Sequence, residues 1–200
     1  TYNFTVILSG VSKPDDRLED ALYAAGCDDA VLGFRNGVGY LEFDREGTSF
    51  QSAVLSALDD VGRSNHPVTV SHVEPGDLVN LSEIARRLNF TREYVRLLSQ
   101  GKRGQGSFPA PQSGVTGTTF VWSWVHVLKW LMGNGFLSDG SLIKKAATIR
   151  NVNLALEYQD DPAQLERQAS LARRIQLRES VVRYEAPTEP VGEDEWDEGR

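Results

Sequence analysis

Along the first third of the chain, segments with the apolar pattern of a β-strand alternate with segments that carry apolar residues at helical spacing. Residues 2–11 are rich in β-branched and aromatic side chains and lead into a Ser-Lys-Pro turn, which predicts a buried strand. Residues 17–26 carry apolar side chains at helical spacing and end in a glycine, which predicts a helix. Apolar runs at 30–34 and 38–43 flank an Asn-Gly pair, and this combination is a strong signal for a β-hairpin.

A second helix and a last strand complete this pattern. Thr48 or Ser49 can cap a helix over residues 50–62, whose large apolar side chains fall on one face, and a short strand follows at 68–73. The order strand, helix, strand, strand, helix, strand is that of the split βαβ, ferredoxin-like arrangement, in which two helices cover one face of a four-stranded antiparallel sheet. We therefore expect a ferredoxin-like α+β domain over residues 1–76.

The pattern then becomes helical. Apolar side chains form one stripe over residues 81–88, and Asn80 or Ser82 can cap this helix. An Asn-Phe pair breaks it, after which Thr91 can cap a second short helix that ends at a glycine. Two short helices joined by a tight turn, with a hydroxyl cap on the second, predict a helix-turn-helix motif.

The rest of the chain extends this motif. Residues 101–117 are rich in glycine, proline and serine, which predicts a loop, and 118–124 read as a short strand that leads into a third helix. We therefore expect a winged helix-turn-helix over residues 77–136. Apolar spacing predicts further helices within residues 137–184, for core packing or for dimerisation through a short coiled coil. Residues 185–200 are acidic and contain proline, which is typical of a disordered tail.

Charge is strongly segregated along the chain. The net charge is −7, yet residues 80–130 hold seven Lys or Arg against two Asp or Glu, whereas residues 1–79 hold five against thirteen. The acidic average argues against nucleic acid as a partner. A local basic segment between acidic flanks instead favours one DNA-contacting surface on an otherwise repelling protein.

Other kinds of chemistry have little support in the sequence. The single cysteine, Cys27, cannot form an internal disulfide, and the three histidines are scattered without zinc-ligand spacing. No P-loop and no catalytic set is present, so we expect no enzyme, no metal and no cofactor. No apolar run reaches about 18 residues and the first twenty residues are acidic, so we expect a cytoplasmic protein without membrane contact, nucleoid-associated when bound to DNA.

The candidate interface lies at the start of the second short helix and in the loop after it. A helix N-terminus offers free backbone N–H groups and the positive end of the helix dipole to phosphate, and first-turn side chains can reach base edges in the major groove. Two cations among glycines at 102–103 could contact the phosphate backbone as a wing. The candidate DNA-binding residues are Ser82, Thr91, Arg92, Glu93, Tyr94, Arg96, Lys102, Arg103 and Gln105.

Residues 79–132 resemble the MerR- and excisionase-type winged helix-turn-helix family, particularly the AlpA-like regulators of prophages. The elements that carry the resemblance are Ser82-Glu83-Ile84-Ala85, Thr91-Arg92, Phe108-Pro109-Ala110-Pro111, Trp122 and Trp130-Leu131, in that order. The resemblance implies sequence-specific binding of double-stranded DNA, with the Thr91 helix in the major groove and the Lys102/Arg103 loop as the wing. The chain departs from the AlpA-like pattern in its longer loop between Gly101 and Phe108.

These observations predict a bacterial or phage-type transcriptional regulator that binds double-stranded DNA as a homodimer. Two alternatives stay open: an antitoxin-like or adaptor module that captures a basic protein through its acidic N-terminal domain, and an architectural DNA-binding protein with little sequence preference. The N-terminal domain could also bind a small effector or pair with a second copy through a sheet edge. The tryptophans at 122, 124 and 130 fit core packing better than a base-stacking platform.

Overall fold

The computed structural model describes residues 1–104, 106–159 and 170, and residues Thr1–Glu157 form one compact unit. Apart from Ser170, the helix predicted over residues 162–182 lies outside the described residues, as does the acidic tail predicted at 185–200. No described helix is both long enough and apolar enough to cross a membrane.

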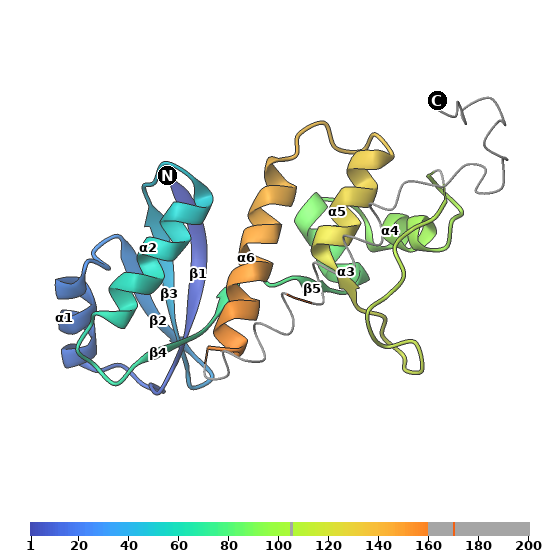
Figure 1. Cartoon of the computed structure of the whole chain (residues 1–200). Coiled ribbons are helices and arrows are strands. Elements are labelled where there is room, and N and C mark those ends of the chain that lie inside the picture. Colours follow the sequence, from blue (N-terminus) through green and yellow to red (C-terminus); the bar gives the residue numbers. More distant parts are fainter. Residues whose placement is uncertain (105, 160–169, 171–200) are drawn as a thin grey trace, which may run out of the picture. The chain divides into compact units, whose positions relative to one another are not determined.

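The first six elements alternate as the sequence predicts. They are β1 (Tyr2–Ser9), α1 (Asp16–Ala25), β2 (Ala30–Arg35), β3 (Val38–Arg45), α2 (Phe50–Gly62) and β4 (Thr69–Glu74). The strands form one sheet in the order β2-β3-β1-β4, and every neighbouring pair is antiparallel (Figure 1). The expectation of a mixed α+β chain built on a four-stranded antiparallel sheet is confirmed.

Local sequence signals explain where these elements begin and end. The side chain of Asp15 accepts a hydrogen bond from the Arg17 N–H at the start of α1, and Gly26 ends that helix in the left-handed region. The hairpin between β2 and β3 turns at Asn36 and Gly37, which have φ angles of 53° and 78°. Both positive angles are what a two-residue hairpin loop requires.

One face of the sheet carries the first hydrophobic cluster. Its buried side chains alternate along β1 as Phe4, Val6 and Leu8 and pack against the apolar stripes of α1 and α2. Helix α6 (Ser141–Glu157) adds Ile149 and Val152 to the same cluster. A helix far along the chain therefore completes the core of the first sheet.

A buried arginine holds three segments together at the edge of this cluster. Arg45 donates to both carboxylate oxygens of Asp29, at 2.7 and 2.8 Å, and to Asp60 at 2.5 Å. A further N–H reaches the backbone oxygen of Gly26 at 2.7 Å. The hydrogen bonds to Asp29, and after them those to Asp60, raise the pKa of Arg45 despite its burial. This group joins β3, α2 and the α1–β2 loop.

The second hydrophobic cluster is built by short elements. They are β5 (Leu78–Val79), α3 (Leu81–Leu88), α4 (Arg92–Ser99), β6 (Trp122–Ser123) and α5 (Trp124–Gly133). Strand β5 was not predicted, because two residues carry no period, and the strand expected over residues 118–124 shrinks to β6, which pairs with β5. Trp122 and Trp124 are 3% and 4% exposed, so they are core residues and the alternative of a base-stacking platform is wrong for both.

Helix α6 contacts both clusters. In Figure 1 the helix lies between the sheet and α5. Ala146 packs in the second cluster, whereas Ile149 and Val152 pack in the first. Directly after Val152, the Asn153 side chain accepts a hydrogen bond from the Val73 N–H at 2.7 Å and donates one to the Val73 carbonyl at 2.8 Å. The amide group thus pairs with the outer edge of β4 as a neighbouring strand would.

We predict that Asn153→Ala lowers the free energy of unfolding by about 1–3 kcal/mol, because both backbone groups of the buried Val73 lose their partners. Urea titration followed by circular dichroism measures the change. Asn151→Ala, at an exposed position on the same helix, is the matched control and should change stability by less than about 0.5 kcal/mol. Equal losses in the two variants would contradict the role assigned to Asn153.

Candidate nucleic-acid interface

Helices α3 and α4 are joined by a tight turn with a cap at each N-terminus. The Asn80 side chain accepts from the Glu83 N–H at 2.9 Å, and the Thr91 hydroxyl accepts from the Tyr94 N–H at 3.1 Å. Between them Asn89 takes a left-handed conformation, with φ of 54°, that turns the chain between the helices. The predicted caps, break and second helix all lie where the sequence placed them.

The two faces of α4 differ in chemistry. Val95 and Leu98 are buried in the second cluster. Arg92 and Glu93 are exposed, and the Arg96 guanidinium binds the Glu93 carboxylate at 2.6 Å. This hydrogen-bonded pair lowers the pKa of Glu93 below its usual range. The outward face therefore presents one free cation beside one ion pair.

The loop after α4 brings two more cations to the same side. Lys102 and Arg103 are exposed, and the Arg103 guanidinium lies 5.5 Å from the centre of the Tyr94 ring. The loop is held from behind, because Trp130 donates to the Gly106 carbonyl at 2.9 Å. The contact between its guanidinium and the Tyr94 ring thus holds Arg103 against α4. Gln105, also predicted at the interface, lies outside the described residues.

The β-ribbon that a wing requires is not at the predicted position. No strand pairing occurs among the described residues of 101–107; instead Ser113 and Val121 form an antiparallel bridge. Gly114 turns the ribbon with φ of 85°, and a Cβ there would meet the Thr119 carbonyl oxygen. The described residues of the Lys102/Arg103 loop therefore lack the strand pairing expected of a wing, and the bridged ribbon lies at 113–121 instead. Sequence reasoning missed the ribbon because its glycine and hydroxyl content is typical of a loop.

The ribbon and the two helix N-termini enclose a small cavity of about 260 Å³. Its polar lining includes Asn80 and Ser82 from the start of α3, Arg92 from α4, and Thr118 and Thr119 from the ribbon. The Arg92 side chain has no hydrogen bond or ion pair within the described part of the chain. Of these residues the sequence indicated Ser82 and Arg92 as contacts; the two threonines were missed because only the ribbon brings them next to the helices.

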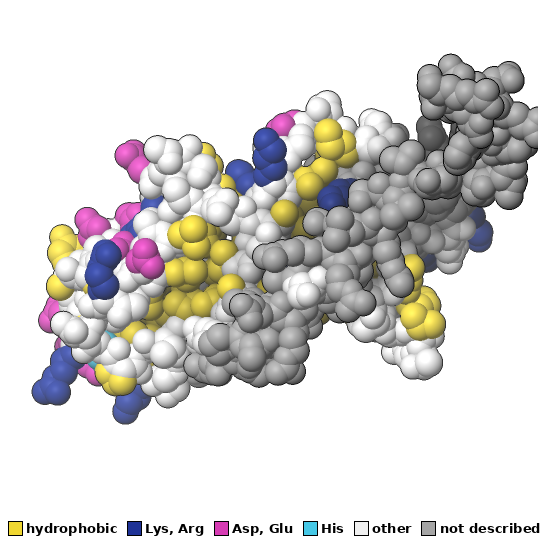
Figure 2. All heavy atoms as spheres, in the orientation of Figure 1, with side chains coloured by type: hydrophobic (Ala, Val, Ile, Leu, Met, Phe, Trp, Pro, Cys, Tyr) yellow, Lys and Arg dark blue, Asp and Glu magenta, His cyan; other side chains and the backbone are white. Residues whose placement is uncertain are grey.

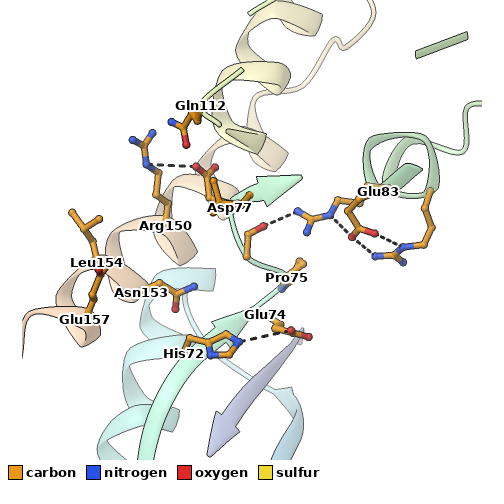
Figure 3. Close-up of a pocket in the computed structure, with 14 residues that line it drawn as sticks. His72, Glu74, Pro75, Asp77, Glu83, Gln112, Arg150, Asn153, Leu154 and Glu157 are labelled. Carbon is orange, nitrogen blue, oxygen red and sulfur yellow. Dashed lines mark hydrogen bonds and ion pairs between the residues drawn. The ribbon is translucent and has the colours of Figure 1, made fainter. Parts of the chain in front are cut away.

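A larger cavity of about 680 Å³ lies between β4, α3 and α6, and its cations are already neutralised (Figure 3). The Glu83 carboxylate binds Arg86 at 2.6 Å and Arg87 at 2.8 Å. Arg87 also donates to the Gly76 carbonyl at 3.0 Å, and its guanidinium lies 5.3 Å from the Trp124 ring centre. Arg150 stands 3.7 Å from Asp77 on the opposite wall. This group holds α3 against the 74–78 connection and does not present free charge.

The basic segment of the sequence thus divides into two sets. Arg86, Arg87 and Arg96 are neutralised by carboxylates of their own helices. The remaining cations, which have no carboxylate partner among the described residues, are Arg92, Lys102, Arg103 and Lys129. Acidic side chains gather over the part of the molecule that holds α1 and α2 (Figure 2). Among the described residues no group of His, Cys, Asp or Glu could hold a metal ion.

We predict that Glu83→Gln destabilises the protein by about 1 kcal/mol near neutral pH, because two arginines lose their shared carboxylate. Hydrogen bonds from Arg86, and then Arg87, lower the pKa of Glu83 from 4.5 to about 2 in the folded protein. The stabilisation is therefore complete above about pH 4.5 and is lost as the pH falls towards 2.

Denaturant titrations at about pH 7 and about pH 2.5 measure this difference. Glu93→Gln, which removes an exposed pair on α4, is the matched control and should cost only a few tenths of a kcal/mol. A Glu83→Gln effect that does not shrink in acid would overturn the assignment.

No protein-family model matches the chain, and neither a curated protein nor a solved structure matches it at a significant level.

Proposed function

We propose that the chain is a sequence-specific double-stranded DNA-binding protein, in which α3 and α4 act as a helix-turn-helix and the 113–121 ribbon as its wing. We also assign the first six elements to the ferredoxin-like arrangement, because of their order along the chain and the antiparallel pairing of their strands. The observation that carries the proposal is that three exposed cations without a carboxylate partner in the described residues flank α4: Arg92 at its first residue, and Lys102 and Arg103 directly after its last turn.

In this proposal α4 enters the major groove. Its first turn presents Arg92, which can donate two hydrogen bonds to one guanine, and Glu93, which can accept from cytosine. The pairing of Glu93 with Arg96 at 2.6 Å holds both side chains in a fixed orientation before DNA arrives. Preorganised side chains lose less entropy on binding, which favours selective contacts.

The phosphate backbone would be held on both sides of α4. Lys102 and Arg103 offer charge on one side, and the cavity between the helix N-termini and the ribbon offers N–H and hydroxyl donors on the other. The described ribbon tip carries no cation, and its Val115 and Phe120 are 67% and 44% exposed. Such a tip would follow a groove through apolar contact rather than charge.

The acidic surface of the remaining chain supports this orientation. With five cations against thirteen carboxylates, residues 1–79 repel DNA and leave one face for approach. The proposal includes a role as a transcriptional regulator in the cytoplasm or nucleoid. The same acidic surface would also suit a basic protein partner, which makes the adaptor function the second candidate.

We predict that Arg92→Ala weakens binding to the preferred duplex about 10- to 100-fold and relaxes base preference, because one base contact is worth about 1–3 kcal/mol. Lys102→Ala/Arg103→Ala should weaken binding to all duplexes and reduce the log–log salt slope by about 0.9 for each lost phosphate contact. Lys13→Ala, at an exposed cation of the first domain, is the matched control and should change neither.

The measurement is fluorescence anisotropy, between about 50 and 200 mM salt, with a duplex selected by the protein from a randomised pool and with its scrambled version. Equal affinity for both duplexes would favour an architectural role over a specific one. Absence of salt-sensitive binding to any duplex would overturn the proposal and favour the adaptor function, which co-purification of a stoichiometric basic partner would then establish.

A further inference from the structure

The two edges of the sheet are treated differently. On one side the outward N–H and C=O groups of Val73 in β4 are bound by Asn153, and the β1–β4 register shifts between Ile7 and Leu8. On the other side β2 ends the sheet, and no described strand pairs with its outer side (Figure 1). A sheet with one covered edge and one open edge has a single place where a further strand can add.

Hydrogen bonding identifies the open groups on β2. The Asp44 N–H donates to the Asp29 carbonyl at 3.0 Å, so residue 29 faces β3. Because bonding direction alternates along an antiparallel strand, Val31, Gly33 and Arg35 also face β3, while Leu32 and Phe34 direct both backbone groups outward. The Ala30 carbonyl also points outward, whereas its N–H is taken by the Cys27 carbonyl at 3.1 Å.

This edge lacks the devices that usually block strand addition. Residues 30–35 contain no proline and no lysine, and the β2–β3 register runs without a bulge. Val31 is 67% exposed, and Ala30, Leu32 and Phe34 are only partly buried at the margin of the first cluster. The side chains of a second strand paired with β2 would bury more of these side chains.

The edge is also self-complementary in charge. Asp28 precedes β2 and Arg35 ends it; both are exposed, and neither side chain has a hydrogen bond or ion pair within the described residues. An antiparallel copy of the strand brings the acidic end of one chain to the basic end of the other. A twofold axis therefore satisfies both ends at once.

We propose that two copies of the chain pair antiparallel through β2, with Leu32 opposite Leu32 of the partner subunit, to form one continuous sheet. This register keeps the core-facing side chains of both chains on one face and places Ala30 opposite Phe34 of the partner subunit. The two Leu32 residues exchange two backbone hydrogen bonds, and each Phe34 N–H meets an Ala30 carbonyl across the axis. Arg35 then lies opposite Asp29 of the partner subunit and one position from the partner subunit's Asp28, whose carboxylate has no hydrogen bond or ion pair among the described residues.

The interface does not depend on DNA binding, so it is tested on the full chain without DNA. Leu32→Cys places two thiols on the twofold axis at about 5.5 Å between Cα atoms, a separation that a disulfide spans. Burial raises the pKa of the native Cys27 thiol to about 11, which keeps it unreactive under mild oxidation. The matched control is Val38→Cys, on the neighbouring strand β3 and 44% exposed.

The expected result is a disulfide-linked dimer from Leu32→Cys and little from Val38→Cys. Sedimentation analysis of variants that keep the native thiol gives a second readout that does not disturb the core. Asp28→Lys and Arg35→Glu should each raise the dimer dissociation constant about tenfold, because the contact occurs twice, and the double variant should restore it.

Two outcomes would overturn the proposal. One is a wild-type chain that sediments as a monomer at every concentration tested. The other is a wild-type dimer in which Leu32→Cys crosslinks no better than Val38→Cys, because the interface then lies elsewhere. Either result leaves the DNA-binding proposal to stand or fall on its own titrations.

Discussion

Helix α6 packs against two hydrophobic clusters and also forms hydrogen bonds with the edge of one strand. Ala146 lies in the second cluster and Ile149 and Val152 in the first, so successive turns of one helix bridge two cores. The Asn153 amide then supplies the donor and acceptor that the outer edge of β4 lacks. Because β4 leads through a short connection and β5 into α3, this contact lies close in sequence to the start of the candidate interface.

The sequence predicted most of the local structure because its signals are local. The Asn36-Gly37 hairpin, the Ser49 cap and the Thr91 cap each depend on residues within a few positions of one another, and each lies as expected. The two-residue strand β5 and the 113–121 ribbon depend on pairing between distant segments that carry no period of their own. Intrinsic β-propensity has little influence on such segments, and tertiary contacts determine whether they form strands.

The sequence identifies the basic segment but not which of its cations are paired. Counting Lys and Arg identifies residues 80–130 as basic, yet the count cannot show that Glu83 neutralises Arg86 and Arg87 or that Glu93 neutralises Arg96. Spacing of three or four residues on a helix hints at such pairs. Whether a pair faces a cleft or an open surface depends on which side of the helix is buried, and that follows from packing.

The unequal edges of the sheet have a consequence for the size of any assembly. Strand addition at β2 would use the same surface on both partners, so the pairing would be isologous. Both β2 edges would then be paired with each other, and neither would stay open. The far edge of each chain is already occupied by the Asn153 side chain. In the proposed dimer, growth of the sheet would therefore end at two chains, because Asn153 already binds both outward backbone groups of Val73 in β4.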